Sequence, residues 1–298
     1  MLAVAGRPAG FVRRTSAALF RHPRAKLALT IAPPLAWMAV VYLGALALLL
    51  VNAFWRVDVF TSFVVRDWGL QNFQTLLDTT VYRTITFRTV GIAAATTMAD
   101  IVLAFPIAYF AARMARPRVR SALLIAVVMP LWVSYLIRVF AWQTITAPNG
   151  LFEWTLDRVG VNAPGIGNSQ WAIWLSFTYL WLPFVILPIY AALERIPGSF
   201  LEASGDLGAK GGMTFRRVVW PLAFPGVVAG SIFSFSLTLG DYIAPTFVGN
   251  TKFIGNVIYD NVGVANNIPL AAAYSLVPVA IMAVYLFIAR RLGAFEAL

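Results

Sequence analysis

The chain has 298 residues, of which 60% are hydrophobic and only 12% are charged. Soluble globular proteins are about 45–50% apolar and about 25% charged, so this composition excludes an ordinary soluble protein. The net charge of +11 comes from basic residues placed between long apolar runs, so it reports on membrane topology and gives no ground for expecting a nucleic-acid partner. The absence of Cys and the single His22 exclude disulfides, thiolate metal sites and a histidine-based metal cluster.

The N-terminal 26 residues form a basic segment ahead of the first apolar run. No compact apolar core followed at once by a small-residue cleavage site is present, so a signal peptide is not indicated. We expect residues 1–26 to be an uncleaved cytoplasmic tail. Its basic residues are Arg7, Arg13, Arg14, Arg21, Arg24 and Lys26.

Six apolar segments follow, each long enough to cross a hydrocarbon layer about 30 Å thick at about 1.5 Å per helical residue. They lie at 27–51, 85–112, 121–146, 170–192, 219–242 and 269–290. The sequence therefore predicts an all-α membrane protein with a six-span transmembrane domain at 27–290 and a short tail at 291–298.

The connections between these segments alternate in charge, and short cytoplasmic loops accumulate Lys and Arg. The connection at 113–120 has four basic residues and no acid, the connection at 193–218 has four more, and the last span ends in Arg290 and Arg291. The connections at 147–169 and 243–268 mix single basic residues with acids, while the connection at 52–84 is ambiguous and is assigned by alternation. Both termini are therefore predicted to be cytoplasmic.

The connection at 193–218 is longer than a bare linker needs to be and has the signals of a short helix. Pro197 with Ser199 can start the helix, Glu202 lies in its early turns, and Gly208 can end it. The sequence predicts an amphipathic helix exposed to the cytoplasm.

Three groups of residues in this loop, Glu202-Ala203-Ser204, Gly208 and Val218-Val219-Trp220-Pro221, follow one another at a defined spacing. This pattern resembles the EAA loop of ABC importer permeases and keeps the spacing of that motif, with mild departures at Ser204, Val218 and Trp220. The resemblance implies a type I importer fold and a coupling helix near 199–212 that docks on a cytoplasmic ATPase. The coupling residues it implies are Glu202, Ala203, Ser204, Asp206, Leu207, Gly208, Ala209 and Pro221.

A second resemblance lies in five other segments, at 129–142, 147–151, 239–249, 253–258 and 267–270. They resemble spermidine/putrescine-type permeases, and most closely the first permease of such systems. That subfamily also includes permeases similar to those for opines and other small cationic or zwitterionic solutes, so the class of transporter is better defined than the solute.

Two charged residues fall inside predicted spans, Asp100 in the second and Arg138 in the third. An isolated charge there costs about 2.5–3.5 kcal/mol on insertion scales. Counted along straight helices, Asp100 and Arg138 differ in depth along the membrane normal by about 7.5 Å, a distance that an Arg side chain nearly spans. They either pair across adjacent helices or each face the translocation pathway. The alternative is that Arg138 snorkels to the outer interface while Asp100 bonds to neighbouring polar groups.

Asp241 and Tyr242 lie where the fifth span meets the outer surface, beside Pro245 and Gly249. A carboxylate and an aromatic ring suit an ammonium ligand, with cation–π attraction worth about 0.5–2 kcal/mol. The alternatives are helix capping for Asp241 and an interfacial belt for Tyr242. Trp142 is a further pathway candidate, although Trp side chains in spans are more often interface anchors or packing residues.

The chain lacks the Gly-x-x-x-x-Gly-Lys-Ser/Thr phosphate loop, so the energy must come from a partner. The resemblance implies a non-catalytic permease of the bacterial inner membrane that binds no cofactor itself. The implied partners are an ATPase pair carrying ATP and Mg, a second homologous permease and an extracytoplasmic solute-binding protein. A polyamine is the expected solute, and another small amine-containing or zwitterionic solute is the alternative.

Two functions of other classes are weighed against this interpretation. One is an ion-coupled carrier that works alone with Asp100 as its coupling site. The other is an intramembrane enzyme, which the lack of a His pair, a metal-binding carboxylate cluster or a nucleophile–base set disfavours.

Overall fold

The computed structural model describes residues 23–58, 60–160 and 166–291. Apart from one short hairpin, the regular elements of these residues are helical, which confirms the predicted all-α membrane fold. By their internal contacts, residues 1–52 and 53–298 form two units, and each is described here by itself.

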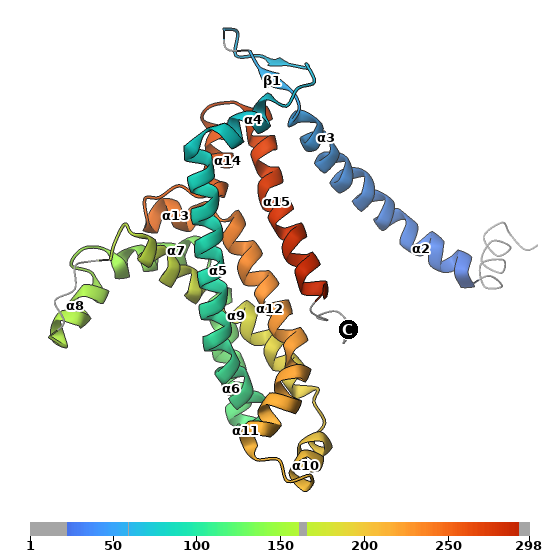
Figure 1. Ribbon diagram of the computed structural model, residues 1–298, viewed down its shortest axis with the longest axis vertical. Helices are drawn as coiled ribbons and strands as arrows, with labels where there is room; N and C mark the ends of the chain where they lie inside the picture. Colours follow the sequence, from blue (N-terminus) through green and yellow to red (C-terminus); the bar gives the residue numbers. More distant parts are fainter. Residues whose placement is uncertain (1–22, 59, 161–165, 292–298) are drawn as a thin grey trace, which may run out of the picture. The chain divides into compact units, whose positions relative to one another are not determined.

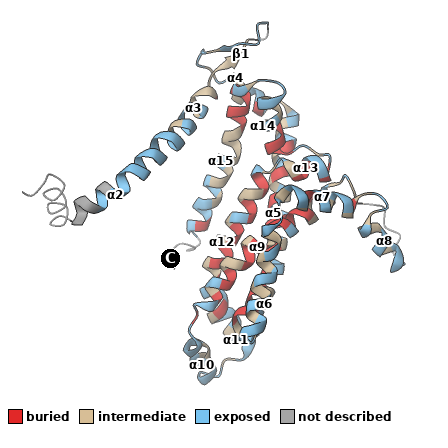
Figure 2. Ribbon diagram, turned by 180° about the vertical axis from the view of Figure 1, so that it is seen from behind, coloured by how far each residue is buried: buried red, intermediate tan, exposed pale blue. Residues whose placement is uncertain are grey.

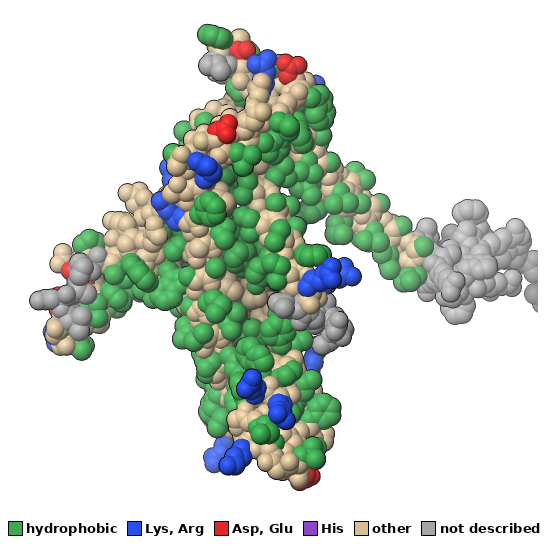
Figure 3. Space-filling view, in the orientation of Figure 1, with side chains coloured by type: hydrophobic (Ala, Val, Ile, Leu, Met, Phe, Trp, Pro, Cys, Tyr) green, Lys and Arg blue, Asp and Glu red, His purple; other side chains and the backbone are tan. Residues whose placement is uncertain are grey.

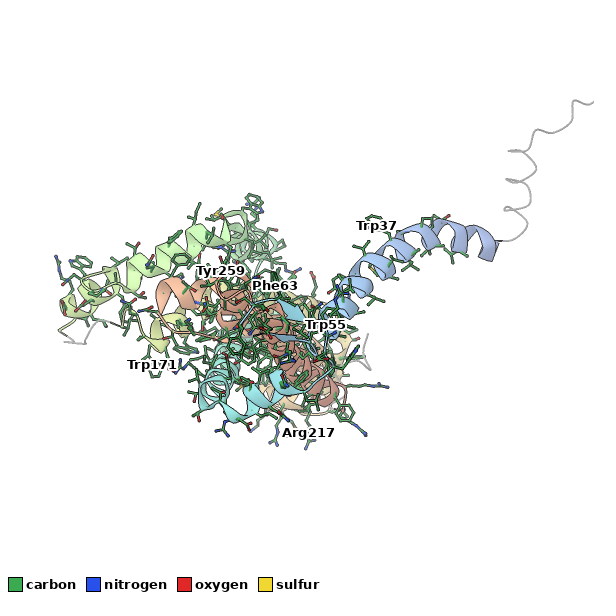
Figure 4. All side chains as sticks on the ribbon, turned by 90° about the horizontal axis from the view of Figure 1, so that it is seen from above. Trp37, Trp55, Phe63, Trp171, Arg217 and Tyr259 are labelled. Carbon is green, nitrogen blue, oxygen red and sulfur yellow. The ribbon has the colours of Figure 1, made fainter. Side chains whose placement is uncertain are left out.

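The first unit is a long apolar helix built from α2 (Pro23–Met38), the π-helical η1 (Ala39–Leu43) and α3 (Gly44–Asn52). The stretch Thr30–Asn52 is long and apolar enough to span a membrane, and none of it is buried within the protein. Trp37, which projects from α2 in Figure 4, is 73% exposed. Such a surface needs lipid or a protein partner around it.

The second unit begins with an antiparallel hairpin of β1 (Arg56–Val57) and β2 (Val64–Val65), followed by α4 (Gln71–Asp78). Asp58 closes the turn by accepting hydrogen bonds from the backbone and the hydroxyl of Thr61, which lower the pKa of its carboxyl. α5 (Thr80–Tyr109) then runs into the π-helical η2 (Phe110–Met114), which gives a continuous span of 35 residues.

The third predicted span is broken, so the prediction of one straight helix at 121–146 is wrong. α6 (Pro117–Val128) and the 3-10 turn η3 (Met129–Trp132) are followed, after a bend of 95°, by α7 (Tyr135–Thr146) and α8 (Leu151–Arg158). Pro130 has no backbone N–H to continue the helical ladder, and Val133 and Ser134 take extended backbone angles. The two halves count as one of the six predicted spans.

The remaining spans are α9 (Gln170–Glu194), a helix over Gly211–Gly240 and α15 (Ile268–Arg291). The helix over Gly211–Gly240 joins α11 (Gly211–Thr214), the π-helical η4 (Phe215–Val219) and α12 (Trp220–Gly240). Three short helices complete the fold, namely α10 (Gly198–Asp206), α13 (Ile243–Val248) and α14 (Ile254–Gly263). With the bent pair as one span, the described residues contain the six spans that the sequence predicts.

The core of the second unit is formed by α5, α9 and α12, which lie side by side (Figure 1). Figure 2 shows that buried residues concentrate on α9 and α12, whereas α10 is exposed. The helices α9 and α12 approach closely because Gly226 and Gly230 have no side chain. A Cβ at Gly226 would lie 2.6 Å from the carbonyl oxygen of Pro188, and one at Gly230 would lie 2.9 Å from Val185 Cα.

Candidate functional site

The predicted coupling helix is present as α10, at the opposite end of the second unit from the hairpin (Figure 1). Pro197 precedes it with extended backbone, so the helix starts where the sequence places the start. Gly208 ends it with a φ of +77°, a left-handed conformation that residues with a Cβ rarely adopt. The amide of Ala209 donates to the carbonyl of Ser204 at 3.0 Å, which closes the end of the helix.

The surface around α10 is apolar for an exposed segment. Leu207 is 89% exposed, and a shallow hollow of about 400 Å³ lies beside it between α10 and the start of the next helix. The hollow is lined by Phe200, Ala203, Ser204, Leu207, Ala209, Met213, Arg217 and Val218. Lys and Arg side chains lie near this end of the protein (Figure 3). An apolar patch with a basic rim is typical of a protein-docking surface.

The other predicted coupling residues lie on or next to this surface. Glu202 and Asp206 are exposed on α10, and Ser204 is hydrogen-bonded to the hydroxyl of Thr214 at 2.9 Å. Pro221 is the second residue of α12, directly after the π-helical stretch and inside the continuous helix over Gly211–Gly240. The structure therefore places Glu202, Ser204 and Asp206 on α10 and Pro221 inside the next span.

Asp100 is fully buried between α5 and α12, where its Oδ2 accepts a hydrogen bond from the Ser234 hydroxyl at 2.6 Å. Thr97 lies next to this pair and its hydroxyl is 3.4 Å from Ser234 Oγ. Among the described residues, Asp100 Oδ1 and the hydroxyl of the neighbouring Thr96 have no hydrogen-bond partner. Asp100 is thus bonded to neighbouring polar groups, as the alternative prediction stated, and keeps one free acceptor.

Arg138 does not pair with Asp100, so the pairing hypothesis is wrong. Its guanidinium lies over the ring of Tyr135, 5.9 Å from the ring centre, and its Nε and Nη1 atoms are buried without a partner in the described part of the chain. The difference in depth between Asp100 and Arg138 was counted along a straight third span. Because the chain bends by 95° between Trp132 and Tyr135, α7 does not continue along the axis of α6.

Asp241 follows the end of α12 and caps the start of α13. Its Oδ1 accepts from the amides of Ile243 and Ala244 at 2.8 and 2.9 Å, and its Oδ2 accepts from the Tyr135 hydroxyl. The capping alternative is therefore confirmed, and the same carboxylate also attaches the second half of the broken span to the fifth span.

The side chains of Tyr242 and Trp142 pack against other aromatic rings. Tyr242 stacks on Tyr259 with ring centres 4.8 Å apart, and Trp142 packs against Tyr179 at 5.6 Å. Of the other Trp side chains, Trp132 and Trp171 are mostly exposed, as membrane-interface anchors are, and Trp181 is buried beside Tyr135.

Sequence reasoning missed several residues that hold this region together. Tyr135 and Ser234 carry no charge and gave no signal individually. A pattern was available, because Ser231, Ser234 and Thr238 lie three and four residues apart and therefore share one face of an otherwise apolar helix. Arg113 and Arg120 entered only as part of the basic connection at 113–120, and Glu194 gave no signal, although all three form specific contacts.

Comparisons with known proteins agree with this geometry. The sequence model of the family described as "Binding-protein-dependent transport system inner membrane component" matches residues 104–295. The chain is 42% identical to "Inner membrane ABC transporter permease protein YdcU" of Escherichia coli K12, over 96% of this chain and 95% of the relative. It is 30% identical to "Spermidine/putrescine transport system permease protein PotB" of the same strain, over 76% and 86%.

Among solved structures, the chain resembles a permease chain of a bacterial ABC transporter "involved in the import of the acidic polysaccharide alginate". The TM-score is 0.68 at 16% identity, over 93% of this chain and 99% of the solved chain. A second neighbour belongs to the MetNI methionine ABC transporter, with a TM-score of 0.52 at 17% identity, over 71% and 94%. At these identities the similarity shows the fold alone.

Proposed function

This chain belongs to the family of binding-protein-dependent transport system inner membrane components, and from that premise we propose that it carries polyamines such as spermidine and putrescine into the cytoplasm. As a member of the family, it is a multi-pass permease subunit of an ABC importer in the bacterial inner membrane. It is not an enzyme, because the ATPase of these systems is a separate subunit. Family membership also removes the alternative of an ion-coupled carrier that works alone.

The observation that supports a polyamine is the similarity to the spermidine/putrescine permeases of Escherichia coli and Haemophilus influenzae, at 30% and 29% identity over 76% of this chain. The relative at 42% identity carries a name that states no solute. A small zwitterionic solute is the second candidate. The observation in its favour is Arg138, whose buried Nε and Nη1 have no partner among the described residues and would suit a carboxylate.

In the proposed mechanism, two ATPase subunits bind ATP and Mg, and their closure pushes on α10 of this chain. A second permease completes the pathway, and an extracytoplasmic binding protein delivers the solute. The exposed apolar side chains of α10 and the adjacent hollow support this docking role. We propose that Asp100, Arg138, Trp142, Asp241 and Tyr242 contribute to the pathway. Alternating access then follows when motion of α10 reaches α9 and the helix that begins at Gly211.

The docking role is tested by purifying the chain from its native membrane in mild detergent and quantifying the ATPase that co-purifies. Glu202→Ala and Gly208→Val are the informative variants. A β-branched residue in the left-handed conformation of Gly208 costs about 1–2 kcal/mol, so the end of α10 should be distorted. We expect at least a several-fold loss of bound ATPase in both variants.

The matched control for this experiment is Asp157→Ala, which removes an exposed carboxylate from α8. We expect normal ATPase recovery from this variant. Equal recovery from wild type, Glu202→Ala and Gly208→Val would refute the docking role of α10. The solute is tested on the same complex with its cognate binding protein, by comparing ATPase stimulation by spermidine, putrescine and an opine. Stimulation by the opine alone would refute the polyamine and support a zwitterionic solute.

A further inference from the structure

Two arginines at the junction of α5 and α6 reach across to the end of α9. The first is Arg113, in the π-helical turn that ends the second span. Its Nη2 donates hydrogen bonds to the carbonyl oxygens of Leu193 and Ile196, both at 2.6 Å. The last carbonyls of a helix have no amide partner within the helix and carry the negative end of its dipole. A guanidinium therefore makes strong charge-assisted bonds to them.

The second arginine, Arg120 in the first turns of α6, contacts both sides of the same junction. Its Nη1 lies 3.2 Å from Glu194 Oε1, an oxygen that also accepts from the Tyr190 hydroxyl at 2.9 Å. Its Nε and Nη2 donate to the carbonyl oxygens of Ala111 and Ala112 at 3.1 and 3.2 Å. One side chain thus joins the end of α5, the start of α6 and the end of α9.

The Arg113 contacts differ from ordinary surface ion pairs, which contribute little because both side chains stay mobile and solvated. The Arg120–Glu194 pair is itself half-exposed, at 36% and 49%, so the contribution of Arg120 rests mainly on its bonds to the backbone carbonyls of Ala111 and Ala112. Leu193 and Ile196, whose carbonyls Arg113 binds, are 0% and 5% exposed and belong to the main apolar core between α5, α9 and α12. Arg116 and Arg118, in the same turn, are exposed, and their side chains form no hydrogen bond or ion pair with the described residues. The two contacting arginines are therefore distinguished by position from the general basic charge of this loop.

The location of these contacts matters because α10 begins only four residues after α9 ends. Along the chain, α10 is attached to the spans through α9 on one side and through the helix starting at Gly211 on the other. Arg113 and Arg120 bind the residues just before α10, so they add a connection from its base to α5 and α6. Figure 1 shows α6 beside the lower part of α5, at the end where α10 lies.

We infer that Arg113 and Arg120 are positioning residues that fasten the base of α10 to the second and third spans, so that a displacement of α10 moves α5 and α6 with it. This inference rests on the proposed docking of α10 on an ATPase. Without the two arginines, α10 would still bind the ATPase, but its motion would reach α5 and α6 only through side-chain packing.

The test measures whether α10 and the start of α6 move together. The chain has no Cys, so spin labels can be placed at introduced Ser199→Cys on α10 and Val119→Cys on α6, both exposed positions. Double electron–electron resonance spectroscopy then gives the distance between the two spin labels in the purified complex. It is measured without nucleotide and after trapping with ATP and vanadate. With both arginines present, we expect one narrow distance that is the same in the two states.

Arg113→Met should broaden this distance distribution and make it differ between the two states. It should also lower, several-fold, the ratio of ATPase activity with and without solute-loaded binding protein. In Arg113→Lys, the distance distribution and the ATPase activity ratio should both return part of the way to their wild-type values, because an ammonium group can donate to two carbonyls. Arg118→Met, in the same turn, is the matched control and should leave both readouts unchanged.

The inference is overturned if Arg113→Met assembles and both readouts stay at their wild-type values, or if the wild-type distance itself changes between the states. If Arg113→Met does not assemble, the same comparison is made with Glu194→Gln, which keeps the side-chain shape and removes the charge that Arg120 binds. Unchanged readouts in that variant would overturn the role of Arg120. Absence of the ATPase from the wild-type preparation would instead refute the proposed function.

Discussion

Carboxylates within an apolar span or directly after its end accept hydrogen bonds from hydroxyl groups of other helices. Asp100 on α5 accepts from Ser234 on α12, and Asp241 accepts from Tyr135 on α7. Each carboxylate thus links two spans that are far apart in sequence. Because a charged group within the membrane is costly without partners, these contacts explain how the two residues are accommodated.

The negative charge of Asp100 can be removed without changing the size of its side chain. Asp100→Asn keeps the shape of the side chain and can still accept from Ser234, but it removes the negative charge and the free oxygen Oδ1. If a cationic solute passes near this residue, we expect transport to fall on the order of tenfold, which corresponds to about 1.4 kcal/mol. Uptake into proteoliposomes measures this, with the recovered ATPase as the control for assembly. Unchanged uptake would remove Asp100 from the pathway.

The partners of these residues could not be predicted from the sequence. The cost of burying Asp100 shows that it needs a partner, but which partner it finds depends on how α5 and α12 are rotated about their axes. Rotation is set by packing of the whole bundle and not by local sequence. For Arg138 the error had a local cause, because its depth was counted along residues 121–146 as one straight helix although Pro130 interrupts the backbone hydrogen bonds.

At the scale of elements, the close contact of α9 with α12 depends on small residues. A Cβ at Gly226 would lie 2.5 Å from Ala192 Cβ and 2.6 Å from Pro188 O, so backbone would have to move to accept it. We therefore expect Gly226→Ala to destabilise the protein by about 1–3 kcal/mol, as over-packing does in other cores. Thermal unfolding in detergent, followed by circular dichroism, measures the effect.

Gly91→Ala is the matched control for this prediction, since it makes the same substitution in the middle of α5, where a Cβ would meet no atom within 4 Å. Alanine is favoured over glycine in helices, so this variant should be neutral or slightly stabilising. Equal unfolding temperatures for the two variants would show that the contact at Gly226 can relax without cost.

The elements themselves were well predicted from local signals. Apolar runs located all six spans, and Pro197 with Gly208 gave the limits of α10, because proline and glycine act on the backbone of their own turn. The extensions at the ends of spans two and five were not predicted. The helix over Thr80–Met114 runs beyond the predicted segment 85–112 at both ends, through residues that include Arg83, Thr84 and Arg113.

At the scale of the whole molecule, the sequence predicts that both termini and the connections at 113–120 and 193–218 face the cytoplasm. The absence of Cys allows this topology to be tested directly. A membrane-impermeant maleimide should label Asp157→Cys on α8 in intact spheroplasts, and should label Arg118→Cys only after the membrane is permeabilised. Labelling of Arg118→Cys in intact spheroplasts would reverse the orientation. Both positions are exposed, so access through the protein itself does not limit the reaction.

The interruption of the third span also has a consequence for how the chain enters the membrane during synthesis. The part before the bend consists of a 12-residue helix and a four-residue 3-10 turn, about 26 Å in all, which is shorter than a hydrocarbon layer of about 30 Å. Such a segment is a poor substrate for insertion as a single helix. We therefore expect it to be retained in the translocon until α9 has been made, and to leave for the lipid together with a neighbouring span.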